Sequence, residues 1–417
     1  MSNALAVYIV LMLAFFGIAS GRLPRLAMNR ASIALTAAIV LVALGGITPE
    51  RALQAIDVET LALLLAMMII VANLRVSGFF SFAGARMLSV ASSPRSLLAL
   101  VVAASGLLSA LFLNDTICIM LTPLLAEILT RTKRDARPYL IALATAANAG
   151  SCATPIGNPQ NMLIASQSGI PFSTFLLSLG PPSLLAMLAS YGVTLLAFPD
   201  EFRDHSLRTL ITDAAAPDAE AAYSAVDRLL MLKSLAASAL LLVLLLAGVR
   251  TSLAALVAAA LLMLTRRINP EHIFAEVDFT LLVFFSGLFV LTAEVASTEL
   301  FSRLMQMAMP LLHRPKAMFA GITTLASNLV SNVPAVMLLS PAARAMPEPA
   351  PAWLMLAMAS TFAGNLTLLG SVANLIVAEQ AGKAGLRMGF LDYLKVGLPV
   401  TLISVIAGTA WLGMLFR

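Results

Sequence analysis

Thr154-Pro-Ile-Gly-Asn-Pro-Gln-Asn161 interrupts a long apolar run, and Thr367-Leu-Leu-Gly-Ser-Val-Ala-Asn374 interrupts another in the second half of the chain. Both stretches place Thr, Gly and Asn at the same spacing. Irregular backbone at membrane depth is tolerated only where protein or a water-filled cavity satisfies its polar groups, so a helix breaker there is informative. Because the same break occurs twice, we expect two broken helices that contribute to one functional site.

A second pair of matching segments extends the repeat. Ile47-Thr-Pro-Glu50, followed by Asp57, reappears as Ile268-Asn-Pro-Glu271, followed by Asp278. Motifs that recur in the same order indicate an internal duplication. We therefore predict a first repeat over residues 1–198, a solvated cytoplasmic linker over 199–228 and a second repeat over 229–417.

The composition places the chain in a lipid bilayer. Of its 417 residues 60% are hydrophobic and 11% are charged, and the mean hydropathy is +0.94. Apolar stretches of about 17 to 25 residues recur, the length that a helix needs to cross about 30 Å of hydrocarbon. The formal charge of +5 comes with Lys and Arg in short loops between spans, so we expect no nucleic-acid partner. The sequence predicts an all-α polytopic membrane protein with about ten transmembrane helices, near 4–21, 31–47, 59–78, 139–165, 171–198, 229–248, 251–266, 279–296, 352–378 and 391–416.

Two further apolar stretches, 96–130 and 317–345, are too long for one helix and carry a polar cluster in the middle. If both fold back as re-entrant hairpins, most of the 26 Lys and Arg residues fall on one side, which the positive-inside rule makes cytoplasmic. Each half then crosses the membrane an odd number of times, so the second half is upside down relative to the first. This is the inverted-topology repeat of secondary transporters, and it puts both termini in the periplasm of a cell inner membrane.

The predicted hairpin tips are Asn114-Asp115-Thr116 and Ser331-Asn332-Val333-Pro334. Tips and half-helix ends expose N–H groups with partial positive charge and carbonyls with partial negative charge. One cluster can therefore hold an anion at its N–H groups and a cation at its oxygens. The predicted substrate- and ion-binding residues are Asn114, Asp115, Thr116, Thr154, Gly157, Asn158, Asn161, Ser331, Asn332, Thr367, Gly370, Ser371 and Asn374.

Asp115 is the clearest carboxylate predicted at membrane depth, where an ionised group needs a partner. We interpret it as a cation ligand or proton carrier; the alternative is a cap on the following helix. We expect no Arg or Lys at the site. Glu294, Cys118 and Cys152 are more simply explained as an interfacial carboxylate and two small buried thiols, and whether they take part stays open. We place His205, His272 and His313 in loops and expect no resident metal or cofactor.

These motifs, together with Asn148-Ala-Gly-Ser151, resemble the ion transporter superfamily, which groups divalent anion/sodium symporters, arsenite permeases and NhaD-type sodium/proton antiporters. They are most similar to YbiR-like inner-membrane anion permeases. The resemblance implies an elevator-type transporter that forms a homodimer, in which the hairpins and the last two spans of each half move against a scaffold. It also implies two sodium sites. Carried over, these would involve Asn114, Asp115, Gly157 and Asn161, and Ser331, Asn332, Gly370 and Asn374.

Two functions remain open at this stage. The first is secondary active transport of a small anion or oxyanion, carboxylate- or arsenite-like, coupled to Na+ or H+. The alternative is a Na+/H+ antiporter in which Asp115 binds the two cations in turn. An enzyme would need a nucleophile–base pair or a metal cluster, and the His-Glu-x-x-His, Gly-x-Ser-x-Gly and phosphate-loop signatures are missing from the sequence. We therefore predict a transporter and no enzyme.

Overall fold

The structure is a computed structural model, and it describes residues 2–21, 27–203, 227–264, 269–312 and 316–416. Most of the predicted linker, together with His205 and His313, lies outside the described residues. Every regular element in the described part of the chain is a helix. In chain order the helices are α1 (Ser2–Ser20), α2 (Arg30–Ala43), α3 (Pro49–Ala55), α4 (Val58–Val76), α5 (Phe79–Val90), α6 (Pro94–Leu111), α7 (Asn114–Arg131), α8 (Ala136–Ser151), α9 (Pro159–Ser168), α10 (Phe172–Ala197), α12 (Arg228–Leu246), α13 (Thr251–Met263), α14 (Pro270–Ala275), α15 (Phe279–Ser297), α16 (Glu299–Leu312), α17 (Lys316–Val330), α18 (Asn332–Ala345), α19 (Pro349–Ala363), α20 (Val372–Lys383) and α21 (Phe390–Leu415).

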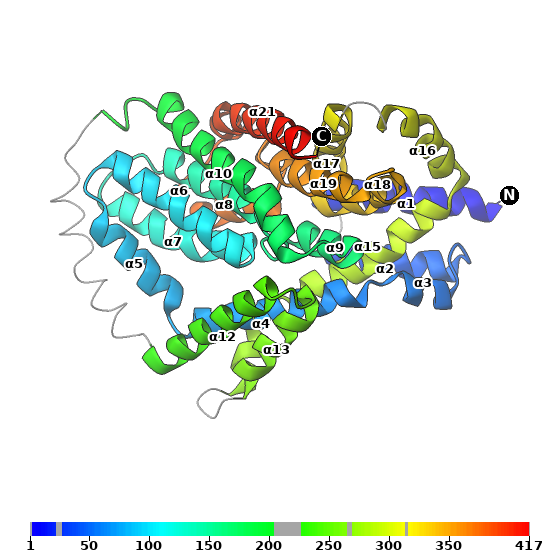
Figure 1. Cartoon of the computed structure of the whole chain (residues 1–417), viewed down its shortest axis with the longest axis horizontal. Helices are drawn as coiled ribbons and strands as arrows, with labels where there is room; N and C mark the ends of the chain where they lie inside the picture. Colours follow the sequence, from blue (N-terminus) through cyan, green and yellow to red (C-terminus); the bar gives the residue numbers. More distant parts are fainter. Residues whose placement is uncertain (1, 22–26, 204–226, 265–268, 313–315, 417) are drawn as a thin grey trace.

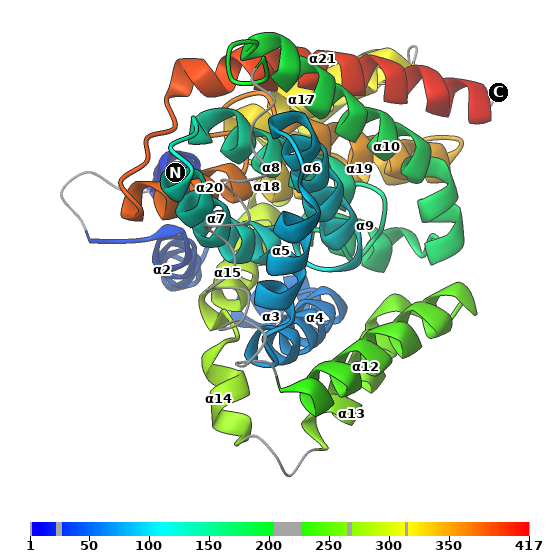
Figure 2. The same ribbon diagram turned by 90° about the vertical axis from the view of Figure 1, so that its left-hand side faces the viewer.

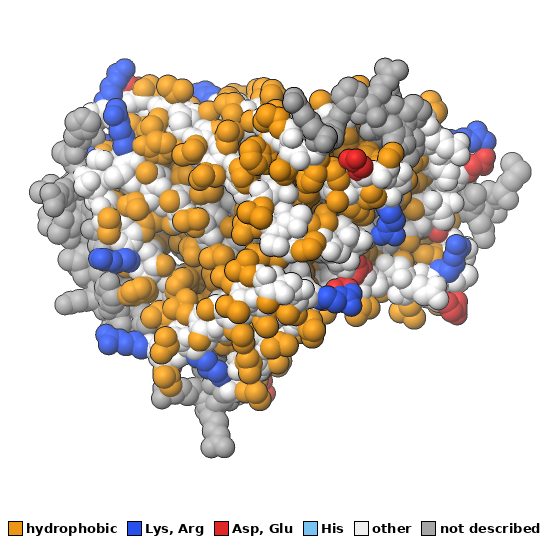
Figure 3. All heavy atoms as spheres, in the orientation of Figure 1, with side chains coloured by type: hydrophobic (Ala, Val, Ile, Leu, Met, Phe, Trp, Pro, Cys, Tyr) orange, Lys and Arg blue, Asp and Glu red, His pale blue; other side chains and the backbone are white. Residues whose placement is uncertain are grey.

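Several helices suit a membrane. Six described helices are long and apolar enough to cross one: α4, α6, α10, α12, α15 and α21. Hydrophobic side chains cover most of the face in Figure 3, and charged ones lie mainly toward its edges. A soluble protein rarely exposes so continuous an apolar surface. The chain is therefore a multi-pass membrane protein.

In both stretches that were predicted to fold back, the helix breaks at the polar cluster. The 96–130 stretch forms α6 and α7, which break after Leu111 and resume at Asn114, and the 317–345 stretch breaks between α17 and α18 at Ser331. The two helices of each stretch pack against each other. The predicted spans 139–165 and 352–378 are each divided in two, as α8 with α9 and as α19 with α20.

The order of the helices repeats along the chain. α1 and α12 both have 19 residues, α4 and α15 both have 19, and α10 and α21 both have 26. Packing repeats as well: α2 lies against α15 as α13 lies against α4, and α6 lies against α8 as α17 lies against α19. The exchange of partners between halves is the pattern that an approximate two-fold axis produces. The orientation of the halves relative to a membrane stays a prediction.

The helices form two packing groups, and each group takes helices from both halves. The hairpin group consists of α6–α10 and α17–α21, and the frame group of α1–α4 and α12–α15. Figure 2 shows α4, α12, α13 and α14 in its lower part and α10, α17, α19 and α21 in its upper part; Figure 1 shows the same separation from the side. α5 and α16, which the sequence analysis does not predict, connect the groups at equivalent places.

Candidate functional site

The first broken helix is held in shape by its own asparagines. Asn158 caps α9 by accepting from the N–H of Asn161 at 2.9 Å. The Asn161 amide donates back across the break to the carbonyls of Ser151 and Thr154, at 3.1 and 3.0 Å. These bonds satisfy backbone groups that a break inside a membrane would otherwise leave unpaired. Asn158 and Asn161 therefore build the irregular segment.

The second broken helix uses the same device. Ser371 caps α20 by accepting from the N–H of Ala373 at 3.3 Å. The Asn374 amide donates to the carbonyls of Gly364 and Thr367 at 2.7 and 3.1 Å. The repeated Asn thus has the same structural task in both halves.

Asn148 of α8 joins the two breaks and the first tip. Its amide nitrogen donates to the side-chain oxygens of Asn365 and Asn374, at 2.9 and 3.0 Å. Its amide oxygen accepts from Asn114 at 3.0 Å and from Ser371 at 3.1 Å. All four hydrogen bonds of the Asn148 side chain are buried, and a buried network of this kind fixes the arrangement of the groups that it links.

Each hairpin tip presents an asparagine whose oxygen has no partner. Asn114 and Asn332 are only 4% and 8% exposed, and neither Oδ1 atom accepts a hydrogen bond from a described residue. The hydroxyls of Ser109 and Ser327, which stand at matching positions before the tips, are likewise unpaired within the described chain. Buried polar groups are nearly always satisfied, so these mirrored oxygens are available to an ion, a substrate or water.

The glycines of the breaks stand among oxygen atoms. A Cβ on Gly370 would lie 3.0 Å from the Gly364 carbonyl oxygen, 3.1 Å from that of Thr367 and 3.2 Å from Asn328 Oδ1. A Cβ on Gly157 would lie 2.3 Å from the carbonyl oxygen of Ser151. Carbonyl and amide oxygens are suitable ligands for a hard cation, and only glycine leaves room for the backbone to come so close.

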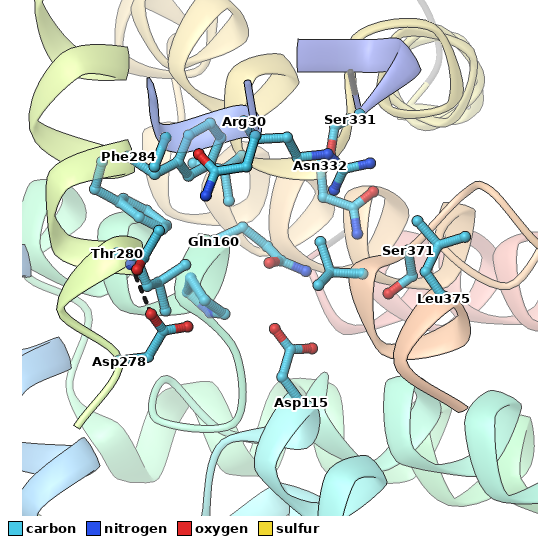
Figure 4. A pocket seen from close by; sticks show the side chains of 18 of the residues that line it. Arg30, Asp115, Gln160, Asp278, Thr280, Phe284, Ser331, Asn332, Ser371 and Leu375 are labelled. Atoms are coloured by element: carbon cyan, nitrogen blue, oxygen red, sulfur yellow. Dashed lines mark hydrogen bonds between the residues drawn. The ribbon is translucent and has the colours of Figure 1, made fainter. Parts of the chain in front are cut away.

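These parts surround one pocket of about 460 Å³, shown in Figure 4. Six helices begin at its wall: α2, α7, α9, α15, α18 and α20. A helix N-terminus carries partial positive charge and free N–H groups. The helix ends therefore supply the pocket with N–H donors that suit an anion.

Three charged side chains line the pocket. Asp115 of α7 and Asp278 of α15 lie on one side in Figure 4, and Arg30 of α2 lies on the other side with Ser331 and Asn332. The expectation that no Arg or Lys reaches the site is wrong. From the sequence, Arg30 is expected in a loop just before the second span. In the structure α2 begins at Arg30, and the side chain lines the pocket.

Only some of the predicted site residues line the pocket. Asn114, Asp115, Ser331, Asn332 and Ser371 line it. Thr116 lines a neighbouring cavity of about 150 Å³ that shares Asp115 and Asp278 with the pocket. The residues that do not line it, and that shape the breaks instead, are Thr154, Gly157, Asn158, Asn161, Thr367, Gly370 and Asn374.

Residues that the sequence analysis missed complete the pocket. Gln160, in the first quoted stretch, lines it. Asp278 belongs to a repeated motif, so its pairing with Asp57 could have drawn attention to it. Asn148 does not line the pocket, and although the family resemblance includes it, its linking role could not be inferred from spacing, because its partners lie in both halves of the sequence.

The pocket lies beside only one of the two matching sets of helices. On the other side α4 packs against α9, and Ser166 donates to the Asp57 carboxylate at 3.2 Å. The equivalent helices, α15 and α20, face the pocket, and Asp278 lines it. Glu294 instead lies beside the turn at Gly46 and is bonded by Ser297 at 3.4 Å, and it does not line the pocket.

Neither cysteine lines the pocket. Cys118 and Cys152 are buried free thiols. The described residues contain no group of His, Cys, Asp and Glu that could hold a metal ion.

Comparisons with known proteins all match this chain to transporters. A sequence profile of the citrate transporter family matches residues 8–363. The rice silicon efflux transporter LSI3 is 34% identical, over 94% of this chain and 93% of its own length. The inner membrane protein YbiR of Escherichia coli is 28% identical, over 86% of this chain and 89% of its own. The crystal structure of the Alcanivorax borkumensis YdaH transporter shares the fold, with a TM-score of 0.54 at 14% identity over 99% of this chain and 98% of its own.

Proposed function

The chain belongs to the citrate transporter family, and from this premise we propose that it carries a small anion or oxyanion across the inner membrane, coupled to Na+ or H+. Family membership makes it a transporter of small molecules and not an enzyme. The substrate and the coupling ion are the proposed part.

The proposal of an anionic substrate rests on one observation: six helices begin at the wall of the pocket. Each N-terminus contributes about half an elementary charge and unpaired N–H donors. Half-helix N-termini pointing at an anionic substrate group are a recurring device in secondary transporters. Carboxylates and oxyanions such as citrate, phosphate or sulfate present suitable acceptor oxygens.

We place the binding sites of the coupling cation at the two hairpin tips. Asp115 supplies a negative charge, and the unpaired Oδ1 atoms of Asn114 and Asn332 supply further oxygens. We propose one cation at Asn114, Asp115 and the carbonyls near Gly157, and a second at Ser331, Asn332 and the oxygens around Gly370. Asn161 and Asn374 are structural in this assignment, because each amide already donates to two or more carbonyls.

The division into two packing groups supports an elevator mechanism. The hairpin group carries both tips and both breaks and would move against the frame group, while α5 and α16 follow as connecting arms. We propose that the protein works as a homodimer with both termini in the periplasm, which makes the open side of the pocket cytoplasmic.

A second function is favoured by the two carboxylates in the pocket. Asp115 and Asp278 could exchange Na+ for H+ without any anion, as in an antiporter. The two functions differ in one respect: the antiporter drives proton flux from a sodium gradient in the absence of substrate.

Proteoliposomes test the proposal. Uptake of citrate, succinate, phosphate, sulfate and arsenite is measured under a sodium gradient and, separately, under a proton gradient. Asp115→Asn removes the charge and is expected to abolish ion-driven accumulation. Glu127→Gln is the control, because Glu127 lies on the same helix, is half exposed, pairs with Arg131 and does not line the pocket.

The outcomes separate the alternatives. Accumulation of citrate, succinate, phosphate or sulfate under one gradient supports anion transport, whereas accumulation of arsenite alone, which is uncharged at neutral pH, does not. Sodium-driven proton flux with no probe present and no probe uptake favours the antiporter. If Asp115→Asn accumulates substrate like the parent protein, the cation role of Asp115 is refuted.

A further inference from the structure

Arg30 is a pocket residue without a partner. It is half-buried at the start of α2, and its side chain forms no hydrogen bond or ion pair within 4.0 Å with any residue that the structure describes. Its charge interacts with that of Asp115, and Asp115 in turn interacts with Asp278. A guanidinium that faces two carboxylates without contacting either one keeps its donors available.

The two-fold arrangement supplies a comparison. Arg250 directly precedes α13, the counterpart of α2, so it stands one position before the exact counterpart of Arg30, and it donates to Glu59 of α4 at 2.9 Å. Glu59 also accepts from Ser252 at 2.7 Å. The counterpart of α4 is α15, and at the place of Glu59 it carries Thr280, which lines the pocket. Arg250 thus has a carboxylate partner, and the equivalent position beside Arg30 offers only a hydroxyl.

The surroundings of Arg30 suit an acidic oxygen. Ser331 and Asn332 lie on the same side of the pocket in Figure 4, and Ser331 makes no cap bond with its hydroxyl. Asn332 is 8% exposed, lines the pocket and keeps an unpaired Oδ1. A guanidinium presents five N–H donors in a planar fork that matches a carboxylate or oxyanion. The opposite side, with Asp115 and Asp278, suits a cation or a hydroxyl donor.

We propose that Arg30 binds an acidic oxygen of the transported anion, and that it does so only when the pocket is open on its own side. Arg30 belongs to the frame group, whereas Asn332 belongs to the hairpin group. When the pocket opens on the opposite side, Arg250 is the arginine nearest to the equivalent place, but it is already paired with Glu59. The transporter therefore binds its anion more tightly from the Arg30 side, an asymmetry suited to collecting a dilute anion there and releasing it on the other side.

This inference rests on the proposed anion transport, and its test is arranged to tell the two apart. The Michaelis constant for citrate, phosphate, sulfate and arsenite is measured from each side of the membrane, in spheroplasts and in inverted membrane vesicles. Arg30→Gln keeps the length of the side chain and removes the charge. Arg250→Gln is the matched control, and Arg30→Lys retains the charge without the fork.

Arg30→Gln is expected to raise the Michaelis constant about tenfold or more in inverted vesicles and less than twofold in spheroplasts, because a charge-assisted bond is lost on one side only. Arg30→Lys lies between the parent and Arg30→Gln, and Arg250→Gln leaves both constants within about twofold. Asp278→Asn, which removes the opposing charge, is expected to lower the constant in inverted vesicles. This variant keeps the test decisive even if Arg30→Gln folds poorly, because Asn can still cap α15.

Each result has one meaning. If the parent protein transports none of the four probes, the proposed function is overturned and this inference falls with it. If the parent transports a probe but Arg30→Gln and Asp278→Asn leave both constants unchanged, or alter both sides equally, the assignment of Arg30 alone is overturned.

Discussion

Gly157 and Gly370 occupy equivalent breaks but tolerate a side chain to different degrees. A Cβ on Gly157 would lie 2.3 Å from one backbone oxygen and 2.8 Å from another, whereas a Cβ on Gly370 would meet its oxygens at 3.0 to 3.2 Å. Overpacking of this kind costs about 1–3 kcal/mol. We expect Gly157→Ala to lower the thermal unfolding temperature strongly and Gly370→Ala to lower it less.

Thermal unfolding in detergent, with and without NaCl, checks this prediction. Gly192→Ala in α10 is the control, since nothing lies within 4 Å of the added Cβ. Gly370→Ala is also expected to lose the stabilisation that Na+ gives the parent, because its methyl group would stand among candidate cation ligands. Equal stability of all three variants would contradict the close approach of the backbone at the breaks.

The Asn148 side chain makes hydrogen bonds to four other side chains. Its amide bonds side chains from the first tip and from the second break. Asn148→Ala leaves those buried groups unpaired and is expected to lower the free energy of unfolding by about 2 kcal/mol or more. Chemical unfolding in mixed micelles measures the change. Ser404→Ala is the control, because that buried hydroxyl donates only within its own helix, to the carbonyls of Val400 and Thr401. A similar loss of stability in both variants would contradict the linking role of Asn148.

The sequence predicted the residues that build the site better than those that line it. Glycine, proline and asparagine at the breaks and tips stand out in an apolar chain, because each is costly there unless it serves a purpose. Arg30 gave no such signal, and Asn148 was indicated only by the family resemblance. Arg30 is one of many arginines at helix ends, and the importance of Asn148 depends on partners more than two hundred residues away in sequence.

The start of α18 is strained where the start of α7 is not. Ser331 has φ +76° and ψ 159°, a region that only glycine adopts easily, whereas Leu113 at the equivalent place has φ −60°. Such strain costs about 1–3 kcal/mol and persists where function requires it. Ser331→Gly is therefore expected to raise the unfolding temperature and, because the hydroxyl lines the pocket, to weaken substrate binding.

The comparison variants make this prediction specific. Ser331→Ala also removes the hydroxyl but keeps the strain, so it should weaken binding without any gain in stability. Leu113→Gly should destabilise the protein, because its backbone needs no glycine. A Ser331→Gly protein less stable than Ser331→Ala would show that the strain is absent.

Helix breaks were predictable, and the connecting helices were not. A polar cluster within an apolar stretch marks a tip directly, so both hairpin stretches were found from sequence. α5 and α16 mix polar and apolar residues without a long apolar run or a repeated motif. Their places follow from the helices on either side of them, which only the folded chain brings into position.

The two halves of the molecule have the same helices but different contacts. Ser166 of α9 holds Asp57 of α4 on the closed side. The residue at the same position along α20 as Ser166 along α9 is Glu379, which pairs with Lys383 at 3.0 Å. Asp278, the counterpart of Asp57, lines the open pocket. If transport exchanges two-fold related contacts, α20 must approach α15 in the other state, as α9 now approaches α4.

Cysteine cross-linking in the membrane tests this exchange most directly. Cys118 and Cys152 are first replaced by Ser, and the pairs Asp57→Cys/Ser166→Cys and Asp278→Cys/Glu379→Cys are each treated with a short bifunctional thiol reagent, with and without a transported probe and a driving ion gradient. We predict that the first pair cross-links in the resting protein, that the second cross-links only during transport, and that either cross-link stops transport. If transport proceeds while the second pair never cross-links, or if a cross-linked protein still transports, the pocket does not work by alternating between two-fold related states.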